Sequence, residues 1–74
     1  MTYNAKAKVL KQPTPAEIKE ARKKAGLTQQ QAAEVVHRAD GARWREWEGG
    51  KYHIDLAVWE LFLLKTGQRT LEKT

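Results

Sequence analysis

The chain has 74 residues, no cysteine, and a formal net charge of +5 from 14 basic and 9 acidic side chains. The lack of cysteine excludes a disulfide framework, a thiolate metal site and thiol redox chemistry. One small core is possible at this length, and because it buries only about 60% of the unfolded surface, a partner subunit would add stability. The basic charge suits a polyanionic partner but does not by itself identify one.

Residues 1–13 come first, and two interpretations of them stay open. Apolar side chains alternate with polar ones in a weak strand pattern at Tyr3, Ala5, Ala7 and Val9. Lys6 and Lys8 fit a flexible basic arm equally well, and we favour the arm. The segment lacks the apolar stretch of a signal peptide, and the apolar residues 56–64 are too few to span a bilayer.

A first helix is expected over residues 15–25. Thr14 and Glu17 form a capping box, Pro15 occupies the first helical position, and Gly26 ends the helix. The stripe expected to face the core consists of Ile18, Ala21 and Ala25. The basic residues of this helix are interpreted as a solvated face, with a phosphate contact as the alternative for Arg22 or Lys23.

Two shorter helices are expected next, over residues 29–36 and 41–48. Thr28 and Gln31 form a capping box for the first, and Asp40 is the expected N-cap of the second. The residues expected to be buried in the first are Ala32, Ala33 and Val36. Trp44 and Trp47 are three apart, a spacing that favours core packing over base stacking. Two short helices joined by a tight turn are typical of a helix-turn-helix that presents its second helix to DNA.

A last helix is expected over residues 56–65, between Asp55 and Gly67. It is apolar nearly all round, which is more than one core-facing stripe requires. We expect one face to close the core and the opposite face to pair with a second copy of the chain. The face that closes the core is expected to include Trp59, Phe62 or Leu63, and the same three residues are taken as the candidate dimer interface.

Residues 15–50 resemble the Cro/CI-type helix-turn-helix family, also called the XRE or lambda-repressor-like family. The shared elements are Gly26-Leu27-Thr28-Gln29, Ala33 and Trp47-Glu48-Gly49-Gly50, and residues 54–62 are similar to small prophage-type regulators. The resemblance implies an all-α domain of four to five helices over residues 14–67, followed by a polar tail at 68–74. Two features depart from the family. His37 stands where glycine is common in a left-handed turn, and one additional residue separates Val36 from Asp40.

The second helix of this motif carries the candidate base contacts. With Asp40 as the N-cap, the groove-facing positions are Gly41, Ala42, Arg45 and Glu46, with Arg43 at the flank. Arg45 suits guanine O6 and N7, Glu46 suits cytosine N4, and Ala42 suits a thymine methyl group. The resemblance also assigns Gln29 to the DNA backbone and to bracing the recognition helix; the alternative is a merely polar helix start.

The candidate phosphate contacts flank this helix at Arg38, Arg43 and Lys51. Pairing of Arg43 or Arg45 with a carboxylate of the same chain is the alternative, and Glu48 is interpreted as structural. Catalysis lacks support, because the chain has no serine nucleophile, and His37 and His53 lack a metal-binding spacing. We therefore expect no enzyme activity, catalytic residue, cofactor, metal or small-molecule substrate.

These features predict a sequence-specific DNA-binding transcriptional regulator, a homodimeric repressor that binds an inverted repeat in double-stranded DNA through its recognition helix. We expect it in the cytoplasm, without membrane contact and associated with the nucleoid when bound to DNA. The alternative is an antitoxin-like or adaptor module that binds another protein through the apolar last helix, with DNA binding secondary. Weak base contacts at Gly41 and Ala42 give this alternative some support.

Overall fold

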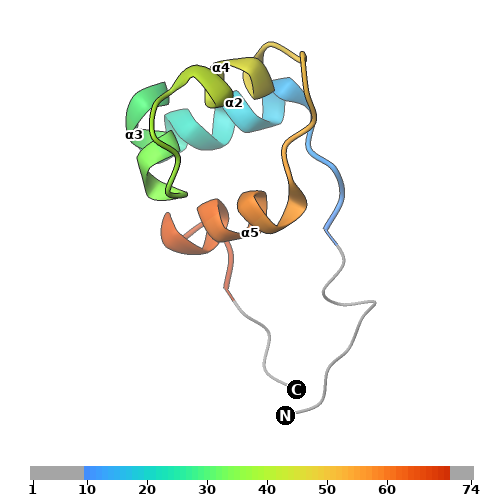
Figure 1. Ribbon diagram of the computed structural model, residues 1–74. Coiled ribbons are helices and arrows are strands. Elements are labelled where there is room, and N and C mark those ends of the chain that lie inside the picture. Colours follow the sequence, from blue (N-terminus) through green and yellow to red (C-terminus); the bar gives the residue numbers. More distant parts are fainter. Residues whose placement is uncertain (1–9, 71–74) are drawn as a thin grey trace.

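The computed structural model describes residues 10–70, and all regular secondary structure in this range is helical. The helices are α2 (Pro15–Lys24), α3 (Gln29–Val35), α4 (Ala42–Glu48) and α5 (Leu56–Lys65). In Figure 1, α2, α3 and α4 cluster together, and α5 lies below them at the end of the segment 49–55. The predicted all-α class is confirmed for the described residues. None of their helices has the length and apolar character needed to cross a membrane.

The helices begin where their capping residues predict. Thr14 Oγ1 accepts from the amide of Glu17 at 3.1 Å, and the Glu17 carboxylate accepts from the amide of Thr14 at 2.8 Å. The box between Thr28 and Gln31 has the same two hydrogen bonds. Asp55 accepts from the amides at the start of α5. Side chains thereby satisfy amide donors that the first helical turn leaves without a partner.

All four helices end in the same motif. The second residue after each helix has a left-handed backbone, at Gly26, His37, Gly50 and Gly67, with φ between 65° and 78°. At each end, two successive amides bond back to carbonyls of the last helical turn, which is the Schellman pattern. His37 is the non-glycine member, with φ of 65°. The left-handed turn expected at His37 is therefore present, and Lys65 Nζ lies 3.1 Å from its Nε2.

After this turn, α4 begins one residue later than predicted. The helix begins at Ala42 and Gly41 is its N-cap, so the assignment of Asp40 as N-cap is wrong by one residue. The carboxylate still caps the helix start, because Asp40 Oδ1 accepts from the amide of Ala42 at 2.8 Å.

The core consists of aliphatic residues from α2 and α3 packed around aromatic rings from α4 and α5. The ring centroid of Trp44 lies 5.5 Å from that of Trp47 and 4.8 Å from that of Phe62. Trp59 stacks on Phe62 at 6.1 Å. The fully or nearly fully buried apolar residues are Ile18, Ala21, Ala32, Ala33, Val36, Trp44, Trp47, Ile54, Trp59 and Phe62. The predicted burial of the two tryptophans of α4 is confirmed.

The same packing corrects the assignment of the dimer interface. Trp59 is 6% exposed and Phe62 is 0% exposed within one chain, so neither side chain is available to a second copy. Leu63 is half-buried and packs against the edge of the core. The aromatic side of α5 closes the core, where the ring of Phe62 packs against that of Trp44.

Both ends of the described chain pack on the domain. Pro13 is buried, Leu10 packs against the core, and Gln12 Nε2 donates to the carbonyl of Ile54 at 3.0 Å. Residues 10–13 therefore belong to the domain and not to an arm. After α5, Gln68 Nε2 donates to the carbonyl of Ala21 at 3.0 Å. Residues 1–9 and 71–74, the rest of the predicted arm and tail, lie outside the described residues.

Candidate nucleic-acid interface

Glu48, the last residue of α4, joins three helices through one carboxylate. Arg22 of α2 donates to it from Nε at 2.6 Å and from Nη2 at 3.2 Å. Gln29 of α3 donates from Nε2 at 3.2 Å, and Trp44 donates from its indole Nε1. The Arg22 and Glu48 side chains are only 14% and 6% exposed. The orientation of α4 is therefore fixed by charge-assisted hydrogen bonds in a mostly buried setting.

These contacts distinguish between the roles that the sequence allowed for Glu48, Arg22 and Gln29. Glu48 is structural, as interpreted from the sequence. Arg22 is not a free phosphate contact, because its guanidinium is held by Glu48 and also donates to the carbonyl of Leu27 at 3.0 Å. The bracing part of the role expected for Gln29 is present, since its amide reaches α4. The pair between Arg22 and Glu48 spans 26 residues, and no local pattern predicts it.

Because of the ion pair between Arg22 and Glu48, the free energy of unfolding should depend on pH in the acid range. Burial raises the pKa of Glu48, but hydrogen bonds from Arg22, Trp44 and Gln29, with the charge of Arg22, outweigh it and bring the pKa below its ordinary value of 4.5. The unfolded chain therefore takes up this proton first as pH falls. We expect the contribution of Glu48 to be complete above about pH 4.5 and to be lost as pH falls through the folded pKa.

Urea unfolding of the wild type and of Glu48→Gln between pH 7 and pH 3 would test this expectation. The difference in the free energy of unfolding between the two proteins should shrink as pH falls. A constant difference would show that ionisation of Glu48 does not contribute.

The outward side of α4 carries two arginines on opposite flanks. Trp44 and Trp47 face the core, whereas Ala42, Arg43 and Arg45 are exposed. Arg45 lies toward α3, with Nη1 beside Gly41 at the start of the helix. Arg43 lies on the other flank, where it lines a cleft with Trp47. Because Glu48 fixes α4, both guanidiniums project from a helix whose orientation is set.

Gly41 is not a groove-facing residue, so its assignment as a DNA contact is wrong. It is buried, and a Cβ added there would lie 3.1 Å from the backbone nitrogen of Gln30 and 3.3 Å from the carbonyl carbon of Gln29. Its own amide donates to Gln30 Oε1 at 3.0 Å. The absence of a side chain thus allows the start of α4 to approach α3 closely.

We expect Gly41→Ala to lower the free energy of unfolding by about 1–3 kcal/mol, because the added methyl group must displace the backbone of α3. Chemical denaturation would measure this change. Ala42→Ser is the matched control at the neighbouring exposed position, where a change within about 0.5 kcal/mol is expected. Equal effects of the two substitutions would contradict the close packing of Gly41.

Glu46 pairs with two of the candidate DNA contacts. Its carboxylate lies 3.6 Å from Arg43 Nε and 3.8 Å from Lys51 Nζ. Both cations also lie 5.5 Å from the ring centroid of Tyr52, a residue absent from the sequence-based assignment. The alternative of pairing within the chain therefore applies to Arg43, while Arg45 has no ion pair among residues 10–70. Such exposed pairs are weak and can exchange for a phosphate.

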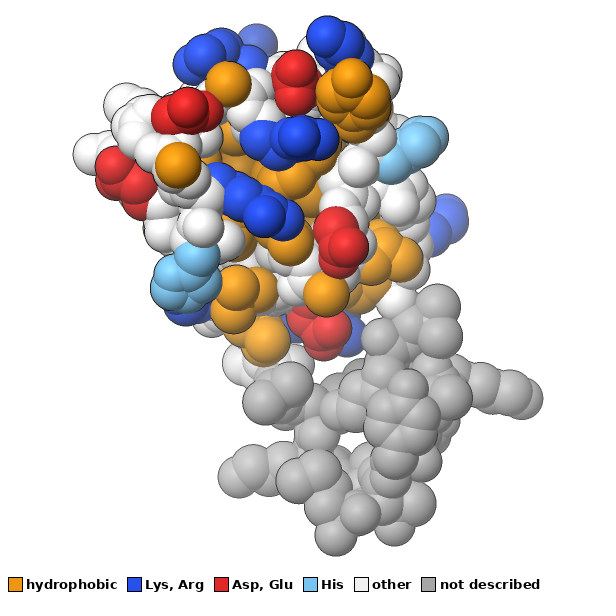
Figure 2. Space-filling model, in the orientation of Figure 1, with side chains coloured by type: hydrophobic (Ala, Val, Ile, Leu, Met, Phe, Trp, Pro, Cys, Tyr) orange, Lys and Arg blue, Asp and Glu red, His pale blue; other side chains and the backbone are white. Residues whose placement is uncertain are grey.

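A cleft of about 400 Å³ lies on the Arg43 flank of α4, between the turn before the helix and the segment 49–55. Its lining consists of Arg38, Ala39, Asp40, Arg43, Trp47, His53 and Asp55. Figure 2 shows basic side chains crossing the middle of this face above hydrophobic ones, with acidic side chains nearby. The sequence placed Arg38 and Arg43 beside the helix but did not indicate a cleft, because its walls come from segments that meet only in the fold.

No protein-family model matches this chain, and a search of curated proteins found no match to it.

Proposed function

We propose that this chain is a sequence-specific DNA-binding transcriptional regulator with a lambda-repressor-like helix-turn-helix formed by α3 and α4. In this proposal a homodimeric repressor binds an inverted repeat, and α4 enters the major groove. Arg45 and Glu46 contact base edges, Ala42 contacts a thymine methyl group, and Arg43, Arg38 and Lys51 contact phosphates.

One observation carries the proposal. The short helix α4 is held from α2 and α3 through the Glu48 carboxylate, while its outer side presents Arg43 and Arg45 to solvent. A helix held in this way can present side chains to a groove without reorganisation, which favours specific recognition. The overall charge of +5 favours association with a polyanion.

Selection of bound sequences from a random duplex library tests the proposal. A dimer that binds successive major grooves should recover a palindromic motif with half-sites about one helical turn, roughly 34–36 Å, apart. Fluorescence anisotropy at two salt concentrations should show affinity falling as salt rises. Salt-sensitive binding without a motif would contradict sequence specificity, and lack of binding at low salt would contradict DNA binding altogether.

Arg45→Ala and Lys51→Ala should have different effects on DNA binding. The first should relax base preference at one position, with a loss of about 1–3 kcal/mol of discrimination. The second should weaken binding to all sequences and reduce the salt slope by about 1. Anisotropy titrations with the selected site and single-base variants would measure both. If Arg45→Ala left preference and affinity unchanged, the assignment of Arg45 to a base would be wrong.

A second candidate function is an antitoxin-like or adaptor module. The burial of Gly41 favours it, because α4 then has one position fewer for bases. Leu56 at the start of α5 is 38% exposed and offers apolar surface to another protein. Shallow salt dependence on heparin and a monomer in light scattering would favour this candidate over the dimeric repressor.

A further inference from the structure

Tyr52, in the segment after α4, lies against two of the candidate phosphate contacts. Its ring centroid is 5.5 Å from Arg43 Cζ and 5.5 Å from Lys51 Nζ. The Glu46 carboxylate lies 3.6 Å from Arg43 Nε and 3.8 Å from Lys51 Nζ. These four residues form one surface group, which we call the Tyr52 cluster.

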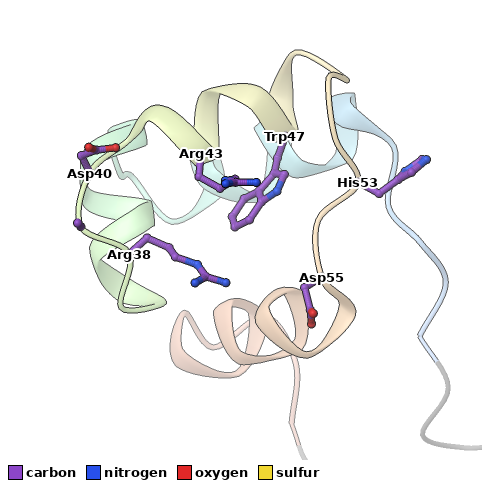
Figure 3. Close-up of a pocket in the computed structure, with 7 residues that line it drawn as sticks. Arg38, Asp40, Arg43, Trp47, His53 and Asp55 are labelled. Carbon is purple, nitrogen blue, oxygen red and sulfur yellow. The ribbon is translucent and has the colours of Figure 1, made fainter.

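The end of α4 brings the cluster together. Gly50 has a left-handed backbone with φ of 78°, and the amide of Lys51 donates to the carbonyl of Glu46 at 3.0 Å. The chain therefore turns back toward the side of the helix that carries Arg43. In Figure 3, the Arg43 side chain extends from the start of α4 in the direction of the segment after the helix, whereas His53 points outward from that segment. His53 is therefore not part of the cluster.

The Tyr52 side chain offers a donor that the rest of the described domain does not use. Tyr52 is 49% exposed, and within residues 10–70 its hydroxyl forms no hydrogen bond. A phenol hydroxyl can donate to an anionic oxygen, and such charge-assisted hydrogen bonds are stronger than neutral ones. The ring also attracts both neighbouring cations, which restricts two long and flexible side chains. Tyr52 thus adds a donor and a support to the same surface.

The cations of the cluster are accessible to a phosphate. The side chains of Arg43 and Lys51 are 56% and 64% exposed, and that of Glu46 is 32% exposed. Two cations share this one carboxylate through long ion pairs, so phosphate oxygens can replace it. In the proposed complex α4 lies in the major groove, and the surfaces beside a recognition helix face the DNA backbone. The cluster lies on the α4 flank opposite to Arg45, the candidate base contact.

We propose that Tyr52 is a further contact to the DNA backbone. Its hydroxyl donates to a phosphate oxygen beside those bound by Arg43 and Lys51, while its ring holds the two cations in position. The inference rests on the proposed function, because it requires the Tyr52 cluster to face a DNA strand. It assigns Tyr52 to affinity and not to base preference, since phosphate contacts carry no sequence information directly.

Tyr52→Phe tests the hydroxyl, since it keeps the ring and removes only the donor. Fluorescence anisotropy should show affinity about tenfold lower for the selected duplex and for its single-base variants alike. The salt slope should stay unchanged because no charge is lost, whereas Lys51→Ala should reduce it by about 1. Thr70→Val, which removes an exposed hydroxyl beyond α5, is the matched control and should leave affinity unchanged. Equal affinity of the wild type and Tyr52→Phe would overturn the contact.

Tyr52→Leu tests the ring. It should weaken binding about two- to fivefold more than Tyr52→Phe does, because Arg43 and Lys51 then lose their aromatic support. Circular dichroism of both variants should match that of the wild type, which separates a loss of binding from a loss of fold. Equal affinities of Tyr52→Phe and Tyr52→Leu would overturn the supporting role of the ring.

A duplex that lacks the selected motif separates this inference from the proposed function. Weaker binding of both duplexes by Tyr52→Phe, with the preference for the motif retained, would support both. If the wild type bound every duplex alike and Tyr52→Phe bound them more weakly, the phosphate contact would be supported and sequence specificity overturned. Equal binding of the motif by the wild type and Tyr52→Phe would overturn the contact and leave the regulator in place. Lack of binding to either duplex at low salt would overturn both.

Discussion

Replacing Phe62 with alanine is expected to lower the free energy of unfolding by about 3–5 kcal/mol, the cost of a large cavity in a packed core. Phe62 is fully buried, and its ring lies 4.8 Å from that of Trp44 and 6.1 Å from that of Trp59. Because a core of this size supplies only roughly 3–5 kcal/mol, the remaining free energy of unfolding should be close to zero and a large fraction of the molecules should be unfolded at room temperature. Circular dichroism and urea titration would measure the loss.

Leu63→Ala is the matched control on the same helix. Leu63 is half-buried, so its truncation should cost less than that of Phe62. If α5 also forms a dimer contact, sedimentation should show a weaker dimer for Leu63→Ala with the fold retained. A folded but monomeric Phe62→Ala protein would contradict the core position of Phe62 and would support its assignment to a dimer interface.

Glu48→Gln is expected to lower the free energy of unfolding by about 2–4 kcal/mol at pH 7. The substitution keeps the shape of the side chain but leaves the mostly buried guanidinium of Arg22 without its counter-ion. It also offers an amide donor where Arg22, Gln29 and Trp44 already donate. The midpoint temperature of thermal unfolding should fall by at least about 8 °C, since each kcal/mol shifts the midpoint of a small domain by roughly 4–8 °C.

Glu46→Gln is the control, because Glu46 lies on the same helix and pairs only at the surface. Its effect on stability should stay within about 1 kcal/mol. Trp44→Phe then isolates one contact, since it retains an aromatic ring but removes the indole donor to Glu48. Equal destabilisation by Glu48→Gln and Glu46→Gln would show that the three-helix contact at Glu48 contributes nothing beyond a surface charge.

The helices were largely predictable because their ends depend on local chemistry. Thr14, Thr28 and Asp55 cap helices within three residues along the chain, and Gly26 and Gly67 end them. The spacing of the α4 tryptophans likewise identified its buried side. These signals lie within a single turn or helix, so no knowledge of the tertiary fold was required.

The candidate site was less predictable because its geometry depends on distant residues. α5 is apolar on nearly every side, so the pattern offered Trp59 and Phe62 both to the core and to a dimer interface, and only the fold shows that they are buried in the same chain. Gly41 could be a groove contact or a packing position until α3 was placed against it. The cleft and the contact of Arg22 with Glu48 also arise only when separate helices meet.

The aromatic rings form a continuous series from Trp59 through Phe62 and Trp44 to Trp47. Indoles this close couple electronically, so their transitions add to the far-ultraviolet circular dichroism of the peptide groups. Helix content estimated from that spectrum alone would then be in error for this protein. The same coupling should give strong near-ultraviolet bands, which would disappear on loss of packing even where helices persist and would thus distinguish a molten state from the native one.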